Sequence, residues 1–353
     1  MSTTNYAFPP SYPPTSMYLP QAYPPQQAYP PAYPPQTVYP SAPPDDIYYH
    51  DCPLQLPKET LEELIETCDI SSSLSQAFYI VKEKFDIVLV WDNSGSMNKE
   101  SSYVDEKGVT INTTRWGESC KVMESIVRFA TTVDTNGVDV YFFDNERHIK
   151  VHNVDDIRKE FTNSAPKSNT LTPIVQTLRR IQADFKENSK DVLIVIVTDG
   201  LPMATPIETV ENLKSTIIDM IQIPEPKFRI SVVLATNDDA VVQMYNEIDD
   251  DLDYFDVSDD YTSEKQEIIA KQGPSFKFRY GDYILKILLG SICLALDKLD
   301  KELINMNQLV KKFTENFDKY GLYYDQKTDA TPATTYENPT RYYEKQNACC
   351  TIM

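Results

Sequence analysis

The sequence predicts an α/β domain with a doubly wound, mainly parallel sheet flanked by helices. The runs FDIVLVW at 85–91 and VLIVIVT at 192–198 are almost wholly apolar, as is typical of central strands in parallel sheets. Segments with helical spacing of apolar residues separate such runs. Strand and helix alternate in this way over about 215 residues, which is the pattern of a doubly wound sheet.

The individual elements follow from local sequence. Strands are expected at 85–91, 138–144, 147–154, 192–200 and 228–236, and helices at 114–133, 172–188, 205–223, 237–248 and 282–299. Two helix starts have capping signals: Thr172 precedes a proline at the first helical position, and Thr205 with Glu208 fits a capping box. The apolar stretch 283–296 is too short for a membrane span and contains Lys286, so it is expected to be a buried helix.

Composition divides the chain into five parts. Residues 1–44 hold 14 of the 25 prolines and no charged residue, so a disordered Pro/Tyr-rich arm is expected there. Residues 45–84 form a helical lead-in segment with a short helix at 56–68, and 85–300 form the α/β domain. An amphipathic helix at 301–321 and a flexible tail at 322–353 complete the prediction.

The arm contains YPP repeats and also two PPxY motifs of the kind that WW domains bind. PPSY contributes Pro9, Pro10 and Tyr12, and PPAY contributes Pro30, Pro31 and Tyr33. A flexible spacer and a WW-docking arm both fit this composition.

Several functional classes are disfavoured. A net charge of −20 opposes binding to nucleic acid and plain electrostatic binding to anionic membranes. The six cysteines have neither zinc-site spacing nor the context of a disulfide framework. No phosphate-binding glycine motif occurs, and the three histidines have no evident nucleophile partner. We therefore expect a protein that is not an enzyme.

Hard oxygen donors follow two of the predicted strands. Asp92, Ser94 and Ser96 come directly after one strand, Asp199 follows another, and Thr170 lies just ahead of a helix between them. Ligands of open parallel sheets bind at the carboxyl ends of the strands, so these side chains are expected to meet there. Oxygen donors without Cys or His favour Mg²⁺, or Mn²⁺, over zinc. Such an ion retains positions for water or for an outside carboxylate.

DNSGSM with a later TDG resembles the metal-ion-dependent adhesion site of von Willebrand factor A (vWA) domains. The resemblance covers roughly residues 85 to 300. It implies that Ser94, Ser96 and Thr170 bind the ion directly, and that Asp92 and Asp199 bind it directly or through water. The family usually has glycine before this threonine, where Ser168 and Asn169 stand here. Thr172 is therefore an alternative ligand to Thr170.

A second departure from the family is an insertion at residues 98–114, between the motif and the first helix. It contains Glu100, Asp105 and Glu106. It is expected to form an inert surface loop. The alternatives are that it covers the metal or that it supplies a carboxylate to the open position.

The last four residues, Cys350 to Met353, fit a C-a-a-X motif in which methionine favours farnesylation of Cys350. Because one lipid chain gives only marginal membrane binding, Cys349 is expected to supply a second signal as a palmitoyl site. Prenylation takes place in the cytosol, so the domain is expected at the cytoplasmic face of a membrane.

Together these features predict a divalent-cation-dependent protein-binding module whose partner offers an Asp or Glu carboxylate to the metal. The alternative is a scaffold protein in which the metal only braces the loops. In that case the PPxY motifs of the arm recruit the partners.

Overall fold

The structure is a computed structural model that describes residues 63–64, 81–104, 109–134, 136–144, 147–203, 205–224 and 227–304. The chain divides into two units, Met1–Ser41 and Ala42–Met353, and all the described residues belong to the second. Both PPxY motifs, most of the expected helix at 56–68, and Cys349 and Cys350 lie outside the described residues. Of the expected helix at 301–321, only 301–304 are described, and they form turn and coil.

A six-stranded sheet in the order β5-β4-β1-β6-β7-β8 forms the centre of the fold. Its strands are β1 (Phe85–Trp91), β4 (Val138–Phe142), β5 (His148–Val151), β6 (Asp191–Thr198), β7 (Phe228–Leu234) and β8 (Phe255–Ser258). All pairings are parallel except that of the edge strand β5 with β4. The chain leaves β1 toward β4 and returns to β6 on the other side, so the sheet is doubly wound, as predicted.

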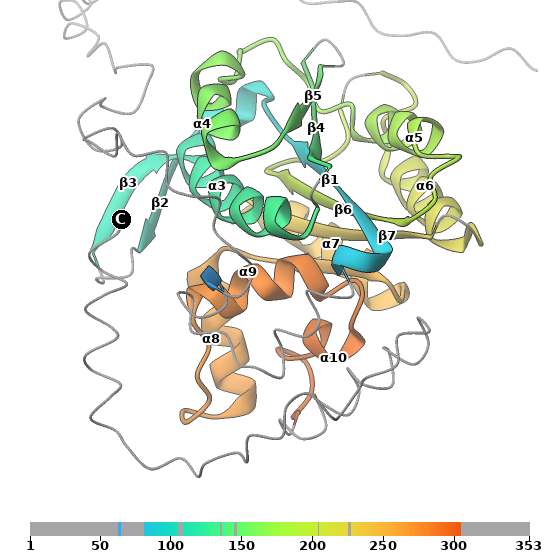
Figure 1. Ribbon diagram of the computed structural model, residues 1–353. Coiled ribbons are helices and arrows are strands. Elements are labelled where there is room, and N and C mark those ends of the chain that lie inside the picture. Colours follow the sequence, from blue (N-terminus) through green and yellow to red (C-terminus); the bar gives the residue numbers. More distant parts are fainter. Residues whose placement is uncertain are drawn as a thin grey trace, which may run out of the picture. The chain divides into compact units, whose positions relative to one another are not determined.

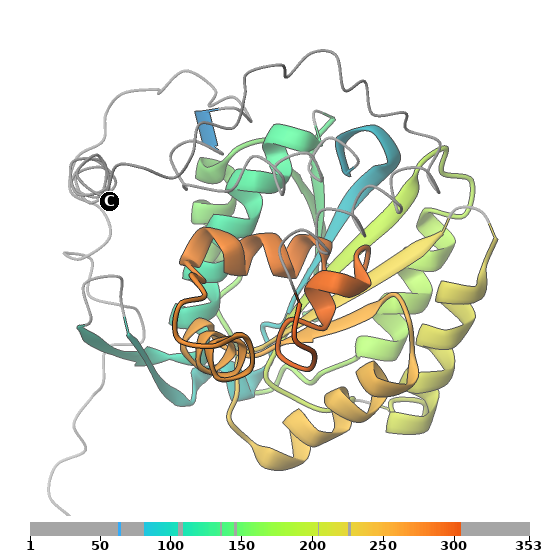
Figure 2. The same ribbon diagram turned by 90° about the horizontal axis from the view of Figure 1, so that it is seen from below.

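Helices cover both faces of this sheet (Figures 1 and 2). One face packs against α3 (Arg115–Val133), α4 (Val154–Asn163), α8 (Tyr261–Gln272), α9 (Tyr280–Leu289) and α10 (Leu294–Asp297). The other packs against α5 (Ile174–Asp184), α6 (Val210–Gln222) and α7 (Asp239–Asp251). In β1, Ile87 and Leu89 face the first core and Val88 and Val90 the second, which explains why this strand has no polar face.

The C-terminal part of the domain differs from the prediction. Strand β8 and helix α8 were not expected, because Asp256 and Ser258 interrupt the apolar pattern of β8. The helix expected at 282–299 is two helices, α9 and α10, separated near Gly290. A Cβ atom on Gly290 would lie 2.3 Å from Asp256, so only glycine permits this approach to β8. Among the described residues, no helix combines the length and hydropathy needed to cross a bilayer.

Two of the expected helix starts are wrong. Helix α5 begins at Ile174 with Pro173 at the cap position, and the backbone of Thr172 pairs instead with Met203. Glu208 forms no capping box with Thr205, since α6 begins later and is capped by Thr209. The Glu208 carboxylate instead accepts hydrogen bonds of 2.8 and 2.9 Å from the amides of Val175 and Gln176. Both amides lie in the first turn of α5, where backbone N–H groups have no partner within the helix. Glu208 therefore caps α5 from a neighbouring loop.

The insertion after the DNSGSM motif is a β-hairpin rather than a loop. Strands β2 (Glu100–Val104) and β3 (Thr110–Thr114) pair with each other and form a separate two-stranded sheet beside α3 (Figure 1). The Ser101 hydroxyl donates to Glu118 at 2.7 Å, and the Lys121 ammonium lies 4.7 Å from the centre of the Tyr103 ring. The prediction of an inert loop is therefore wrong in its structure, because the hairpin is fastened to the first helix of the domain.

Candidate metal centre

The two aspartates of the predicted site lie together at the carboxyl edge of the sheet. Trp91 at the end of β1 pairs with Val197 near the end of β6, so the residues that follow the two strands emerge side by side. The amide of Asp92 donates to the Val197 carbonyl at 2.9 Å, and Asp92 and Asp199 are both buried. The sheet register thus places two carboxylates from distant parts of the sequence at one site.

Asp92 is held by hydrogen bonds to both carboxylate oxygens. Oδ1 accepts from the backbone amide of Ser94 at 2.8 Å, and Oδ2 accepts from the Thr198 hydroxyl at 2.6 Å. Burial raises the pKa of Asp92 to about 6, and the charge of Asp199 adds to this effect against the opposing hydrogen bonds. A buried pair of carboxylates is costly unless a positive charge lies beside it.

The two serines connect one aspartate to the other. The hydroxyl oxygens of Ser94 and Ser96 are 3.0 Å apart, and the Ser96 hydroxyl donates to Oδ1 of Asp199 at 2.7 Å. In an octahedral Mg²⁺ site with ligands at about 2.1 Å, adjacent ligand oxygens are about 3.0 Å apart. The serine hydroxyls therefore have the spacing of two neighbouring ligands of such an ion.

The loop before α5 approaches the serines through its backbone. The amide of Gly95 donates to the Thr170 carbonyl at 2.9 Å. A Cβ atom on Gly95 would lie 2.8 Å from the Ser168 carbonyl oxygen, so this contact requires glycine. Within the described residues, the half-buried Thr170 hydroxyl makes no hydrogen bond to the aspartates or serines. The loop that carries Thr170 therefore lies against the serine loop, and Thr170 as a metal ligand stays a prediction.

Thr172, two residues further along the same loop, is buried. Its amide donates to the Met203 carbonyl at 2.7 Å, and its carbonyl accepts from the Met203 amide at 2.9 Å. Its hydroxyl lies 3.7 Å from the position of a Cβ atom on Gly200. This bridge fixes the loops after β6 and before α5 to each other.

Two residues at the site were not found from the sequence. Thr198, which holds Asp92, was counted only as the last residue of an apolar strand. Arg115, the first residue of α3, places a guanidinium nitrogen 2.6 Å from Oδ2 of Asp199. Thr198 is the threonine of the TDG motif, so the motif itself is a local signal for it. No local signal exists for Arg115, because it is 84 residues from its partner Asp199.

The donor set fits a hard divalent cation. Asp92 and Asp199 supply two negative charges, and Ser94 and Ser96 supply neutral oxygens, which is the chemistry that Mg²⁺ or Mn²⁺ accepts. Among the described residues no group of three or more His, Cys, Asp or Glu side chains could hold a metal. A site at this edge would therefore depend on hydroxyl oxygens and water. Within the described residues, no hydrogen bond or ion pair joins the side chains of Asp92, Ser94, Ser96 or Asp199 to the hairpin.

The two histidines among the described residues, His148 and His152, lie on β5 and directly after it. His148 lies on β5, where its Nε2 is 2.7 Å from Asp139 and its ring stacks on Tyr141. His152 is exposed at the end of that strand. Neither ring contacts Asp92 or Asp199.

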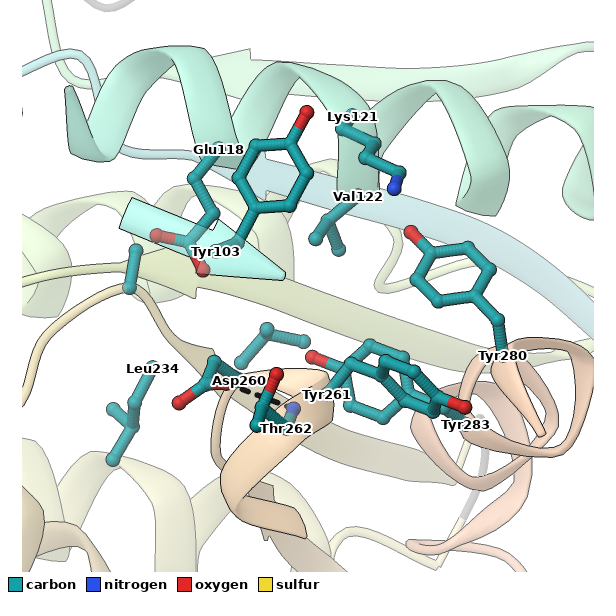
Figure 3. A pocket seen from close by; sticks show the side chains of 12 residues that line it. Tyr103, Glu118, Lys121, Val122, Leu234, Asp260, Tyr261, Thr262, Tyr280 and Tyr283 are labelled. Carbon is teal, nitrogen blue, oxygen red and sulfur yellow. Dashed lines mark hydrogen bonds between the residues drawn. The ribbon is translucent and has the colours of Figure 1, made fainter. Parts of the chain in front are cut away.

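A separate small cavity lies between the hairpin, α3, α8 and α9 (Figure 3). Tyr103 and Tyr280 flank the Lys121 ammonium, which lies 4.7 and 5.1 Å from their ring centres. The cavity has a volume of about 30 Å³, which is room enough for water and is far below the volume of an ordinary ligand pocket. We interpret it as part of the attachment of the hairpin.

The chain is distantly similar to solved structures of pilus proteins. No family model matches the chain, and no curated protein matches it. The similar solved structures include the PilB minor pilin of Streptococcus sanguinis, at 14% identity and a TM-score of 0.35 over 50% of this chain and 57% of that one. The pilus adhesin SpaC of Lactobacillus rhamnosus GG has 14% identity and a TM-score of 0.34, over 58% of this chain and 31% of SpaC.

The vWF domain of the type V pili tip protein Mfa5 of Porphyromonas gingivalis has 10% identity and a TM-score of 0.27, over 70% of this chain and 98% of that domain. The chain thus spans just over half of PilB and about a third of SpaC.

Proposed function

We propose that the chain is a non-enzymatic module that binds a protein partner through a divalent cation, Mg²⁺ or Mn²⁺, at the carboxyl edge of the sheet. The observation that carries this proposal is the meeting of Asp92, Ser94, Ser96 and Asp199 at the ends of β1 and β6. When bound, the ion would supply an electrophilic centre for a carboxylate oxygen of the partner.

In this proposal the residues of the chain have distinct tasks. The hydroxyls of Ser94 and Ser96 are the direct ligands, with Thr170 as the third, following the resemblance to vWA domains. The carboxylates of Asp92 and Asp199 supply the charge that retains the ion, directly or through water. Thr198 and the amide of Ser94 fix the orientation of Asp92, as partners of metal ligands commonly do.

The surface beside the site supports a protein partner. Leu171, Met203 and Ile207 are exposed by 46%, 62% and 40%. The bridge between Thr172 and Met203 joins the loops on which they lie. Exposed apolar side chains gathered beside a polar site are a feature of protein-binding surfaces. A partner carboxylate flanked by apolar residues would match both parts of this surface.

The proposal includes a membrane tether through farnesyl on Cys350 and palmitoyl on Cys349, with the domain in the cytoplasm. The Pro/Tyr-rich arm would add reach or a second, weak docking site. These parts rest on sequence motifs alone.

A scaffold function is the second candidate, and one observation favours it. The ion pair of Arg115 with Asp199 braces the loops at the sheet edge with the chain's own cation. In this case the PPSY and PPAY motifs recruit WW-domain proteins, and the metal contributes little.

Capture of partners from cell lysate by the full chain separates the two candidates. The bait proteins are wild type, Asp92→Asn with Asp199→Asn, and a chain lacking residues 1–44, each in Mg²⁺ and in EDTA. Asp251→Asn is the matched control, since it removes a carboxylate from an exposed ion pair with Lys214. Partners lost in EDTA and with the double variant, and retained by the control, support the metal-dependent module. Partners lost only with the arm overturn it in favour of the scaffold.

A further inference from the structure

The ion pair of Arg115 with Asp199 is a buried contact at the candidate metal site. The Arg115 side chain is 15% exposed, the Asp199 side chain is fully buried, and Nη1 lies 2.6 Å from Oδ2. The other oxygen of Asp199 accepts the Ser96 hydroxyl. Both oxygens of Asp199 therefore have donors, and one of these donors carries a positive charge.

The hairpin insertion fixes the backbone that presents Arg115. The Arg115 amide donates to the Lys99 carbonyl at 3.0 Å, and Glu100 pairs with Thr114 across the hairpin. Thr114 caps α3 by accepting a 3.2 Å hydrogen bond from the Gly117 amide. Residues 99 and 115 are thus held together at the base of the hairpin, directly after the DNSGSM motif. The insertion therefore places the first residue of α3 beside the metal motif.

A guanidinium in this position and a divalent cation compete for the same charge. Two positive groups a few ångströms apart in a buried site repel each other strongly. Asp92 and Asp199 together supply only two negative charges, one of which Arg115 already balances. The guanidinium also has another carboxylate within electrostatic reach, because its charge acts on Glu118 one turn along α3.

We propose that Arg115 is a tethered cation that competes with the divalent ion for Asp199, so that the ion binds well only when the guanidinium has moved away from this carboxylate. The inference rests on the metal site of the proposed function. The hairpin then has a function at the metal site, because it holds the competing residue in place. It makes Arg115 a residue that sets metal affinity without being a ligand.

Calorimetric titration of Mn²⁺ into the full chain tests this inference. The variants are Arg115→Gln, which removes the charge, and Arg115→Lys, which keeps it. Arg158→Gln is the matched control, because Arg158 pairs with Glu124 and Asp155 on the exposed side of α4. Removing one nearby charge from a site of this kind is expected to lower the Kd for Mn²⁺ by at least about ten-fold. Arg115→Lys and Arg158→Gln should stay within about three-fold of wild type, the usual scatter of single contributions.

The outcomes separate the two levels of the proposal. Equal and measurable Kd values in all four proteins, or weaker binding by Arg115→Gln, overturn the role of Arg115 and leave the metal site standing. No binding by any of the four overturns the metal site itself, and with it this inference.

A second experiment uses only the wild-type protein, so its result does not depend on whether a variant folds. Modification of Arg115 by phenylglyoxal, followed by mass spectrometry, should become faster in Mn²⁺, and an unchanged rate contradicts the inference.

Discussion

The Thr198 hydroxyl donates a 2.6 Å hydrogen bond to Oδ2 of Asp92, and this contact joins the end of β6 to the carboxylate that follows β1. Asp92 is fully buried, and its other oxygen is held by the Ser94 amide. The carboxylate thus has a single orientation before any ion binds. Pre-positioned ligands of this kind reduce the cost of assembling a metal site.

Thr198→Val is therefore expected to weaken both the fold and the site. Valine keeps the shape of threonine but leaves Oδ2 of a buried carboxylate without its donor, which costs about 1–3 kcal/mol. Chemical denaturation in EDTA measures this loss, and Mn²⁺ titration should give at least about ten-fold weaker binding, as for partners of metal ligands. Thr198→Ser retains the hydroxyl and should behave nearly as wild type. Equal losses in both variants would assign the effect to packing.

Gly95→Ala is expected to separate the serine loop from the loop before α5. The added Cβ would lie 2.8 Å from the Ser168 carbonyl oxygen, a backbone atom that cannot move aside cheaply. Overpacking of this kind costs about 1–3 kcal/mol of unfolding free energy. Gly200→Ala is the matched control, because its nearest neighbour would be the Thr172 hydroxyl at an ordinary 3.7 Å. If the two variants are equally stable, the loops are not in close contact.

Glu264 on α8 predicts a pH dependence away from the metal site. Burial raises its pKa from 4.5 to about 7, although Lys286 opposes this shift. The folded protein therefore holds a proton that the unfolded chain has lost, and stability falls as pH rises from 4.5 to about 7. The contribution is at most about 3 kcal/mol. Denaturation of wild type and Glu264→Gln across this range should show that the unfolding free energy falls less with rising pH in the variant. Parallel plots of unfolding free energy against pH would contradict the prediction.

Lys286→Met is expected to be strongly destabilising. The buried ammonium lies 3.2 Å from Asp256 and 3.3 Å from Glu264, both of them buried. Removing one member of a buried ionic cluster leaves unpaired charge and costs about 3–5 kcal/mol. Lys214→Met breaks an exposed pair with Asp251 and should change stability by less than about 1 kcal/mol. Similar losses in both variants would mean that the Lys286 cluster is open to water.

The sequence was sufficient for the parts of the fold that depend on local pattern. Continuous apolar runs predicted β1 and β6, and the rule that parallel strands end at one edge correctly brought Asp92 and Asp199 together. The apolar pattern did not predict strands in which polar residues are buried and paired with residues distant in the sequence. Asp256 in β8 is buried because it pairs with Lys286 from α9, and a local reading cannot supply that partner.

The same limit applies to contacts between loops. Glu208 was expected to cap its own helix, and it caps α5 instead because the loop before α6 folds back over that helix end. Arg115 was expected only as a residue of the helix at 114–133, and the hairpin and the sheet register place it against Asp199. Both cases depend on tertiary geometry that residue type and spacing do not encode.

Anomalous diffraction from crystals of the Arg115→Gln protein grown in Mn²⁺ would show whether a divalent ion binds at the carboxyl edge of the sheet. We expect an anomalous peak within bonding distance of the Ser94 and Ser96 hydroxyl oxygens, at about 2.1–2.2 Å, with Asp92 and Asp199 beside it. A well-ordered site without such a peak at saturating Mn²⁺ would overturn the proposed metal site. The sheet edge would then be a hydrogen-bonded brace, and binding would have to be sought in the arm and the tail.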